Sequence, residues 1–253
     1  MTETVELRSG TTMPMVGFGT WQLRGEQAYD AVSFALETGY RHLDTATMYR
    51  NEDEVGRAVR DSAVGRQDIF ITTKLPAERR NRIRQTLEES LSALGTDYLD
   101  LWLIHWPPGG AAPDVWAEFI KLRDEGLTRA IGVSNYSVAQ LTELTTATGE
   151  TPAVNQIPWS PKHYDPAVLD EHRRMGVVLE GYSPLKGARL KDKTLTQIAS
   201  RYGVTPAQVV LRWNLEHGVV VIPKSAHRDR IAENFAIDGF ELNHAEVVAI
   251  DEI

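Results

Sequence analysis

The sequence of 253 residues contains no cysteine. This absence excludes disulfides, thiolate catalysis, and zinc or iron–sulfur sites that depend on cysteine ligands. No apolar run approaches the roughly 18 residues that a membrane span needs. The first residues, MTETVELRSG, do not have the charged and then apolar pattern of a secretory signal. We therefore expect a cytoplasmic protein that does not enter a membrane.

The sequence also has fewer basic than acidic side chains, 27 against 35, which gives a net charge of -8. Such a balance argues against binding to a polyanionic nucleic acid, although a local basic pocket for one small anion is compatible with it. The seven histidines show no HExxH-type spacing, so we expect no catalytic metal. The remaining composition, 42% hydrophobic and 25% charged, is typical of a globular enzyme.

Short apolar segments alternate with longer amphipathic ones along the whole chain, and no linker rich in Pro, Gly or Ser divides it. Two clear helical patterns cover 26–38, which stops before Gly39, and 83–94. The predicted strands are 15–19, 41–44, 69–74, 98–105, 129–134, 153–156, 177–183 and 219–225. Eight strands alternating with helices predict an α/β fold, a (β/α)8 TIM barrel that forms a single domain over residues 1–253.

The first segment, VELRSGTTMPM, alternates in polarity around Ser9 and Gly10. This pattern predicts an N-terminal β-hairpin that is separate from the barrel strands. We expect the hairpin to close the bottom of the barrel, at the end opposite the active site.

Titratable side chains stand at the ends of three neighbouring predicted strands: Asp44, Lys74 and His105, with Tyr49 in the loop just past Asp44. Each has an ordinary structural explanation when taken alone. Asp44 can cap a turn, Lys74 can be a solvated strand end, and His105 can be a core histidine. In a parallel barrel, however, the C-terminal strand ends meet at one place, which is where such enzymes keep their active site.

The four side chains suit proton donation to a developing alkoxide. A free tyrosine has a pKa of about 10, so its phenol is a weak acid until a nearby cation favours the phenolate. Lys74 can supply that cation while Asp44 keeps the ammonium charged and oriented. His105 then hydrogen-bonds the substrate carbonyl. Since an alkoxide forms when hydride reaches a carbonyl, the reaction also needs a hydride donor.

The Rossmann signature for a dinucleotide is absent, because Gly17-Phe18-Gly19 has no third glycine at the required place. A barrel offers a different phosphate site, formed by the loops after strands 7 and 8 and by a short extra helix. The segment IPKSAHRDRIAENF has the composition of such an element, with Lys224, Ser225 and Arg230 before Glu233 and Asn234. The alternative is a solvated helix start that carries a few charges.

Eight strings in order along nearly the whole chain resemble the aldo-keto reductase family: GFGTW, GYRHLDTATMYRNEDEVG, ITTKL, LDLWLIHWP, IGVSNYS, VNQIPWSP, GYSPL and IPKSAHRDRIAEN. The resemblance implies an NADPH-dependent enzyme that reduces aldehydes and ketones to alcohols. It also implies a catalytic tetrad of Asp44, Tyr49, Lys74 and His105, which agrees with the argument from the strand ends.

The resemblance further implies which residues contact the cofactor and the substrate. Cofactor contacts fall on Thr20 and Trp21, on Ser134, Asn135 and Gln156 at the nicotinamide carboxamide, on Tyr182 stacked against the ring, on Ser183 and Leu185 along the pyrophosphate, on Lys224, Ser225 and Arg230 at the adenosine phosphate, and on Glu233 and Asn234 at the adenine. The substrate wall falls on Trp21, Tyr49, His105 and Trp106.

The chain departs from the family pattern in several places. The loops PPGGAAPD and KGARLKDK are short, Ser160 stands where the family commonly has histidine, and the sequence ends at VVAIDEI where family members usually continue into a tail over the substrate. We therefore expect an open pocket that accepts a broad range of small-molecule carbonyl substrates, in a monomeric protein.

The sequence leaves two other functions open. Asp44 and Glu180, both near strand ends, could form the carboxylate pair of a barrel glycoside hydrolase. Alternatively, the chain could be a nucleotide-binding regulatory subunit of the same fold that turns over poorly, because a fold does not by itself settle a function.

Overall fold

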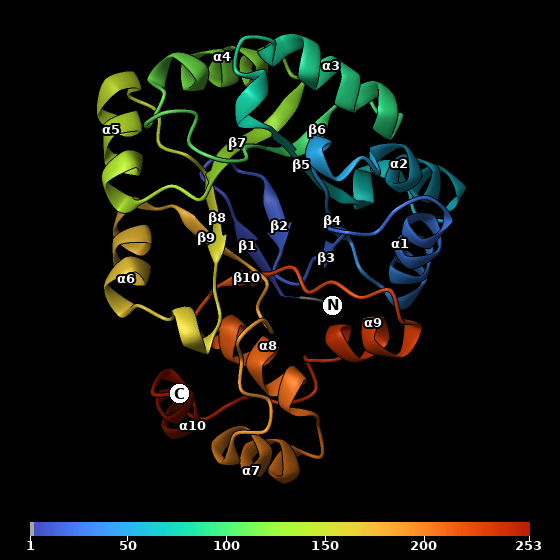
Figure 1. Ribbon diagram of the computed structural model, residues 1–253, viewed down its shortest axis with the longest axis vertical. Helices are drawn as coiled ribbons and strands as arrows, with labels where there is room; N and C mark the ends of the chain where they lie inside the picture. The colour runs from blue at the N-terminus through green and yellow to red at the C-terminus, as the bar shows by residue number, and fades with distance from the viewer. Residues whose placement is uncertain (1–2) are drawn as a thin grey trace.

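The computed structural model describes residues 3–253, so residues 1 and 2 of the predicted domain 1–253 lie outside the described residues. Eight parallel strands follow one another from β3 to β10 in a single curved sheet, which forms the ring at the centre of Figure 1. They are β3 Phe18–Gly19, β4 His42–Asp44, β5 Phe70–Leu75, β6 Leu99–Ile104, β7 Thr128–Ser134, β8 Val154–Pro158, β9 Val178–Tyr182 and β10 Val220–Val221. The predicted (β/α)8 fold is confirmed.

The seam between β3 and β10 closes through a short contact. Val16 forms a parallel bridge with Val221, and the amide of Gly17 donates a hydrogen bond of 2.8 Å to the carbonyl of Val221. Both seam strands are shorter than the predicted 15–19 and 219–225. Pro223 has no N–H to donate across the seam, but its carbonyl still accepts a hydrogen bond of 3.1 Å from the Gly19 amide. The chain then continues along the active-site end of the barrel.

Helices surround the ring of strands (Figure 1). They are α1 Glu26–Thr38, α2 Glu52–Asp61, α3 Ile83–Leu94, α4 Pro113–Asp124, α5 Val138–Thr148, α6 Pro166–Met175, α7 Lys193–Tyr202, α8 Pro206–Glu216, α9 Arg228–Phe235 and α10 His244–Asp251. Among residues 3–253, none of these helices has the length and apolar character that a membrane crossing requires.

The two helices predicted over 26–38 and 83–94 are confirmed with the same bounds. Each stops at a glycine with a positive φ, 122° at Gly39 and 65° at Gly95, a conformation that costs glycine little and other residues more. The main core lies between the strands and these helices. Its packing is illustrated by Trp102 of β6, which stacks on Phe119 of α4 with ring centroids 3.9 Å apart.

The predicted N-terminal hairpin is confirmed as β1 Thr4–Glu6 and β2 Thr12–Pro14, which pair antiparallel. In Figure 1 the hairpin crosses the centre of the ring. The carbonyl of Pro14 lies 3.2 Å from Nδ1 of His42, the first residue of β4. The hairpin therefore covers the end of the barrel where the strands begin, which leaves the opposite end for the site.

Candidate active site

A cavity of about 550 Å³ opens at the C-terminal strand ends; we refer to it as the mouth cavity. Its lining residues are Gly19, Trp21, Gln22, Asp44, Met48, Tyr49, His105, Trp106, Ser134, Asn135, Gln156, Tyr182, Ser183, Pro184, Leu185, Lys186, Ile222, Pro223 and Lys224. Three of the four predicted catalytic residues lie on this wall, and Lys74 lies beneath it, fully buried. The strand ends thus bring together the residues that the sequence singled out.

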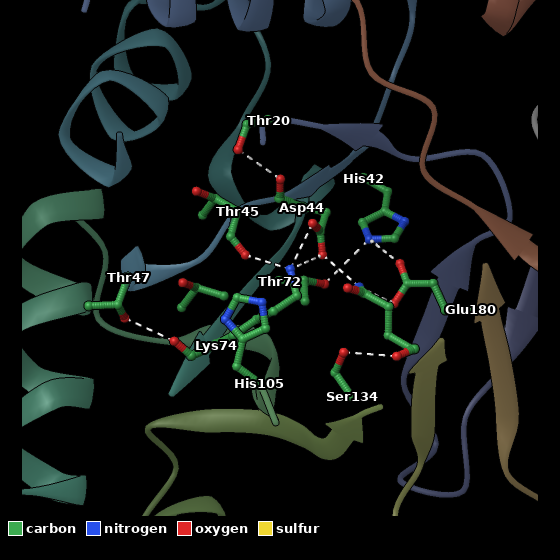
Figure 2. A network of polar contacts seen from close by, with 12 residues as sticks. Thr20, His42, Asp44, Thr45, Thr47, Thr72, Lys74, His105, Ser134 and Glu180 are labelled. Atoms are coloured by element: carbon green, nitrogen blue, oxygen red, sulfur yellow. Dashed lines mark hydrogen bonds and ion pairs between the residues drawn. The ribbon is translucent and has the colours of Figure 1, made fainter. Parts of the chain in front are cut away.

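Lys74 and Asp44 form a buried ion pair on neighbouring strands (Figure 2). Asp44 of β4 is paired in register with Thr72 of β5, so Lys74, two residues further along β5, points to the same face of the sheet. Burial acts to lower the pKa of Lys74, but the charge of Asp44 and the hydrogen bond to it help to outweigh burial, and the pKa is raised. A third bond, from Nζ to the carbonyl of Thr45 at 2.8 Å, fixes the ammonium.

Tyr49 ends a short 3-10 helix, Thr47–Tyr49, just past β4. The Lys74 Nζ lies 5.2 Å from the centre of the Tyr49 ring. Burial raises the pKa of Tyr49, and the Lys74 charge acts in the opposite, predicted direction without cancelling it. The phenol therefore stays protonated at neutral pH, which is the state that a proton donor requires.

His105 packs edge-on against Tyr49, with ring centroids 5.8 Å apart. Burial, together with the Lys74 charge, lowers the pKa of His105 to about 3, so the imidazole is neutral near pH 7. Within residues 3–253, its Nδ1 is buried and has no hydrogen-bond partner. A neutral imidazole carries one N–H, and placing it on Nε2 avoids an orphaned buried donor.

Four polar residues at the ends of three strands adjoin this group. Ser134 Oγ donates to the Gln156 carbonyl at 2.8 Å, and Asn135 Nδ2 donates to Ser134 Oγ and to the His105 carbonyl, each at 3.0 Å. Tyr182 OH donates to Asn135 Oδ1 at 2.9 Å. Asn135 has a φ of 64°, a left-handed conformation that Asn tolerates better than most residues. The set offers donors and acceptors at the cavity wall, as an amide ligand requires.

Apart from the carboxamide contacts, the residues predicted for the cofactor divide into two groups. Tyr182, Ser183, Leu185 and Lys224 line the mouth cavity, whereas Ser225, Arg230, Glu233 and Asn234 lie outside its lining. Arg230 is exposed on α9, and Glu233 accepts a hydrogen bond of 2.7 Å from the Thr205 hydroxyl. Thr20 is fully buried, and its hydroxyl donates to the Asp44 carbonyl at 2.9 Å.

Several wall residues were not predicted from the sequence. Gln22, Met48 and Lys186 line the mouth cavity, and the first of these has a φ of 65°, which is uncommon for a residue other than glycine. Met48 stands between Thr47 and Tyr49 and is 49% exposed. The sequence does contain a signal for Met48, because a large apolar side chain stands there in a polar loop, next to the candidate catalytic Tyr49.

Glu180 of β9 is fully buried and is not among the residues that line the mouth cavity. Gln156 lies between it and Asp44, because Gln156 Nε2 donates to Asp44 Oδ2 at 2.8 Å and to Glu180 Oε2 at 2.9 Å. A glycoside hydrolase needs both carboxyl groups against the substrate. The arrangement of Glu180 therefore does not support the hydrolase alternative.

Comparisons with known proteins show similarity over nearly the whole chain. The family described as "Aldo/keto reductase family" matches residues 15–253. A methylglyoxal reductase, DkgA of Salmonella typhimurium strain LT2, is 42% identical over 254 residues, which cover 98% of this chain and 92% of the relative. The crystal structure of an aldo/keto reductase from Brucella melitensis superposes with a TM-score of 0.96 at 42% identity, covering 100% and 99% of the two chains. A Bombyx mori aldo-keto reductase in complex with NADP gives 0.93 at 32% identity, covering 100% and 92%.

Proposed function

The chain belongs to the aldo/keto reductase family and reduces carbonyl groups with NADPH. We propose that Tyr49 donates the proton to the carbonyl oxygen, and that Lys74, Asp44 and His105 assist this proton transfer. The observation that carries this proposal is the buried contact of Lys74 with Asp44 beneath the Tyr49 ring. Hydride is the chemistry that NADPH supplies when it is bound. The protein's own side chains must then meet the negative charge that develops on the carbonyl oxygen.

Tyr49 meets that charge by donating its phenolic proton. As the proton leaves, the phenolate gains the nearby Lys74 ammonium as a counter-charge, 5.2 Å from the ring centre, in a dry environment that strengthens the attraction. Asp44 keeps that ammonium charged and directed. The neutral His105, with its proton on Nε2, donates to the same oxygen and fixes its angle.

The cofactor contacts that we propose follow the composition of the wall. Ser134, Asn135 and Gln156 would hold a carboxamide, and the Tyr182 ring would pack against a flat heterocycle. Lys224, which is exposed at the cavity edge, would meet a phosphate as a point charge. We assign Ser225, Arg230, Glu233 and Asn234 to the adenosine end of the cofactor, beyond the mouth cavity. Thr20 would support the cavity wall from behind, through its hydrogen bond to the Asp44 carbonyl.

The substrate class that we propose is small aldehydes and dicarbonyls, with tolerance of bulkier ketones. Two of the substrate-wall residues, Trp21 and Trp106, are each 49% exposed, and so is Met48. Such a rim contacts one side of a substrate and does not enclose it, and each missing methylene-sized contact gives up about 1–3 kcal/mol of discrimination. A small dicarbonyl needs little enclosure, which also fits the relative named as a methylglyoxal reductase.

We also propose that the protein acts as a monomer. Among residues 3–253, the exposed large hydrophobic side chains are Trp21, Met48, Trp106 and Val248, and the first three surround the mouth cavity. A stable partner interface usually buries a larger apolar patch than the single remaining valine offers. Sedimentation at several protein concentrations would test this assignment.

The test of the function is the near-ultraviolet absorbance of NADPH mixed with the protein, with and without a dicarbonyl. We expect the absorbance to fall only when the carbonyl compound is present. A protein that binds NADPH with a measurable Kd but consumes none of it with any aldehyde, dicarbonyl or keto ester would instead be the regulatory nucleotide-binding subunit.

A further inference from the structure

The orientation of the Gln156 amide follows from its neighbours. Asp44 carries no donor when ionised, so the amide nitrogen of Gln156, and not its oxygen, must face Asp44 Oδ2 at 2.8 Å. The second N–H of that nitrogen goes to Glu180 Oε2 at 2.9 Å. Both amide hydrogens are therefore engaged, and within residues 3–253 the amide oxygen accepts no side-chain hydrogen bond. Gln156 thus has an acceptor left for a ligand in the mouth cavity.

The other carboxyl oxygen of Glu180 has a different neighbour. Glu180 Oε1 is buried without a hydrogen-bond partner among the described residues, and it lies 3.6 Å from His42 Nε2. A dashed line in Figure 2 marks this contact. Burial lowers the pKa of His42 to about 3, so this imidazole is neutral. Its single N–H must be on Nδ1, since that atom faces the Pro14 carbonyl at 3.2 Å and a carbonyl only accepts.

His42 Nε2 therefore presents a lone pair to Glu180 Oε1. The hydroxyl of Thr72, 3.3 Å from Nε2, can donate to it or rotate away. The ring itself cannot withdraw, because Gly17 packs so closely that a Cβ built there would lie 2.5 Å from His42 Nδ1. Two lone pairs held face to face in a dry interior repel each other unless one atom carries a proton. The oxygen Oε1 is the atom that can carry it.

The charges around Glu180 favour the same state. From β4 it faces Asp44 and the neutral His42, from β5 the Lys74 ammonium, and from β8 the uncharged Gln156. From β10 its register partner is the apolar Val220. Burial, followed by the Asp44 charge, raises the pKa of Glu180 to about 8, and the Lys74 charge only partly opposes this.

We propose that Glu180 is a positioning residue that carries a proton at neutral pH. Its Oε2 accepts from the Gln156 amide nitrogen and so keeps the Gln156 amide oxygen turned toward the mouth cavity. Because the acid is uncharged, no second negative charge lies beside Asp44. The effect of this protonation on catalysis rests on the proposed function. The protonation itself does not, because it concerns the protein alone.

The first experiment is infrared spectroscopy of the protein without cofactor, comparing wild type with Glu180→Gln. The substitution mimics a protonated acid, since its carbonyl can accept from Gln156 and its amide can turn an N–H toward the lone pair on His42 Nε2. Below pH 8 we expect a carboxylic-acid C=O band in the wild type that Glu180→Gln removes, and the band should disappear from the wild type well above pH 8. Glu52→Gln is the control, because Glu52 is a second buried carboxyl, bound at 2.6 Å by Thr73.

The second experiment is NADPH affinity as a function of pH, followed by fluorescence titration without substrate. The wild-type Kd should rise as pH increases through about 8, whereas the Kd of Glu180→Gln should change less over the same range. Glu180→Ala frees the Gln156 amide, and losing one such bond weakens NADPH binding by about fivefold.

Two outcomes would overturn the proposal. A carboxylic-acid band that Glu180→Gln leaves in place would show that Glu180 is ionised. Matching pH dependence of the Kd in wild type and Glu180→Gln would show that the charge of Glu180 does not reach the site. Neither readout needs turnover. An inactive enzyme would therefore contradict the proposed function, while the infrared result would still decide whether Glu180 is protonated.

Discussion

Lys74 Nζ lies 2.8 Å from Asp44 Oδ1 and 2.7 Å from Asp44 Oδ2, and neither side chain is more than 2% exposed. Both charges are buried, so the pair stabilises the protein only while both partners are present. Either partner alone would be a buried charge with no counter-charge. The pair therefore links the stability of the barrel to the chemistry at its mouth.

Asp44→Asn should lower the free energy of unfolding by about 3–5 kcal/mol, since it leaves the Lys74 ammonium buried without its carboxylate. Urea denaturation would measure the loss. The matched control is Glu26→Gln, which breaks the Arg57–Glu26 pair at 2.8 Å on the surface, where the side chains are 41% and 74% exposed. That pair should contribute about 0–1 kcal/mol. Equal losses in the two variants would contradict the account of the buried pair.

His105 should make the protein sensitive to acid. Its pKa is about 3 in the folded state, against 6.5 as the ordinary value, so the unfolded chain binds the extra proton first as the pH falls. Stability is therefore lost between pH 6.5 and pH 3, with a slope of at most about 1.4 kcal/mol per pH unit from this residue.

His105→Gln should flatten this acid limb in urea unfolding measured at several pH values below neutrality, while His227→Gln, at an exposed position, should not. An unchanged acid limb in His105→Gln would mean that the imidazole is not kept neutral by its surroundings.

The preference for NADPH over NADH should depend on Arg230 and Lys224. The two cofactors differ by one phosphate, and a charge-assisted hydrogen bond contributes roughly 1.5–3 kcal/mol. Arg230→Ala should raise the Kd for NADPH far more than the Kd for NADH. Arg228→Ala is the matched control, because it removes the same charge from α9 at a residue that lies over the Phe34 ring, 4.8 Å from its centre. Equal losses for both cofactors in Arg230→Ala would place Arg230 away from the phosphate.

The exposed rim should matter most for bulky substrates. Trp106→Ala removes a side chain that lines the mouth cavity and is 49% exposed, so it should raise KM for aromatic keto esters more than for a small dicarbonyl. Each lost apolar contact of methylene size corresponds to about 1–3 kcal/mol. We expect kcat/KM across a size-graded panel to show this trend. A wild type that favours one substrate by several orders of magnitude would mean that another segment closes the mouth.

The barrel was predictable because its signals are local. Apolar strands alternate with helical patterns, and helices such as α1 stop at a glycine that the sequence displays. The convergence of Asp44, Lys74 and His105 was predictable as well, because parallel strands must end at the same side of a barrel.

The environment of Glu180 could not be predicted in this way. Its contacts with Gln156 and His42 depend on which side chains the closed barrel turns inward and at what depth, and sequence spacing does not give that register. The sequence shows only that Glu180 lies near a strand end, where it could also serve as a hydrolase carboxylate. The two seam strands are shorter than the sequence predicts, because Pro223 removes one donor from the ladder that joins the last strand to the first.

The proton donation by Tyr49 is the central claim, and single-turnover reduction of a dicarbonyl by wild type and Tyr49→Phe tests it most directly. With enzyme and NADPH premixed, the variant should bind NADPH with a similar Kd yet oxidise it on the order of 100-fold more slowly or worse, because removing a general acid has that effect. Tyr29→Phe, which removes a surface hydroxyl bound to Asp61 at 3.0 Å, should keep the wild-type rate. A Tyr49→Phe protein that reduces the dicarbonyl at near the wild-type rate would contradict the account.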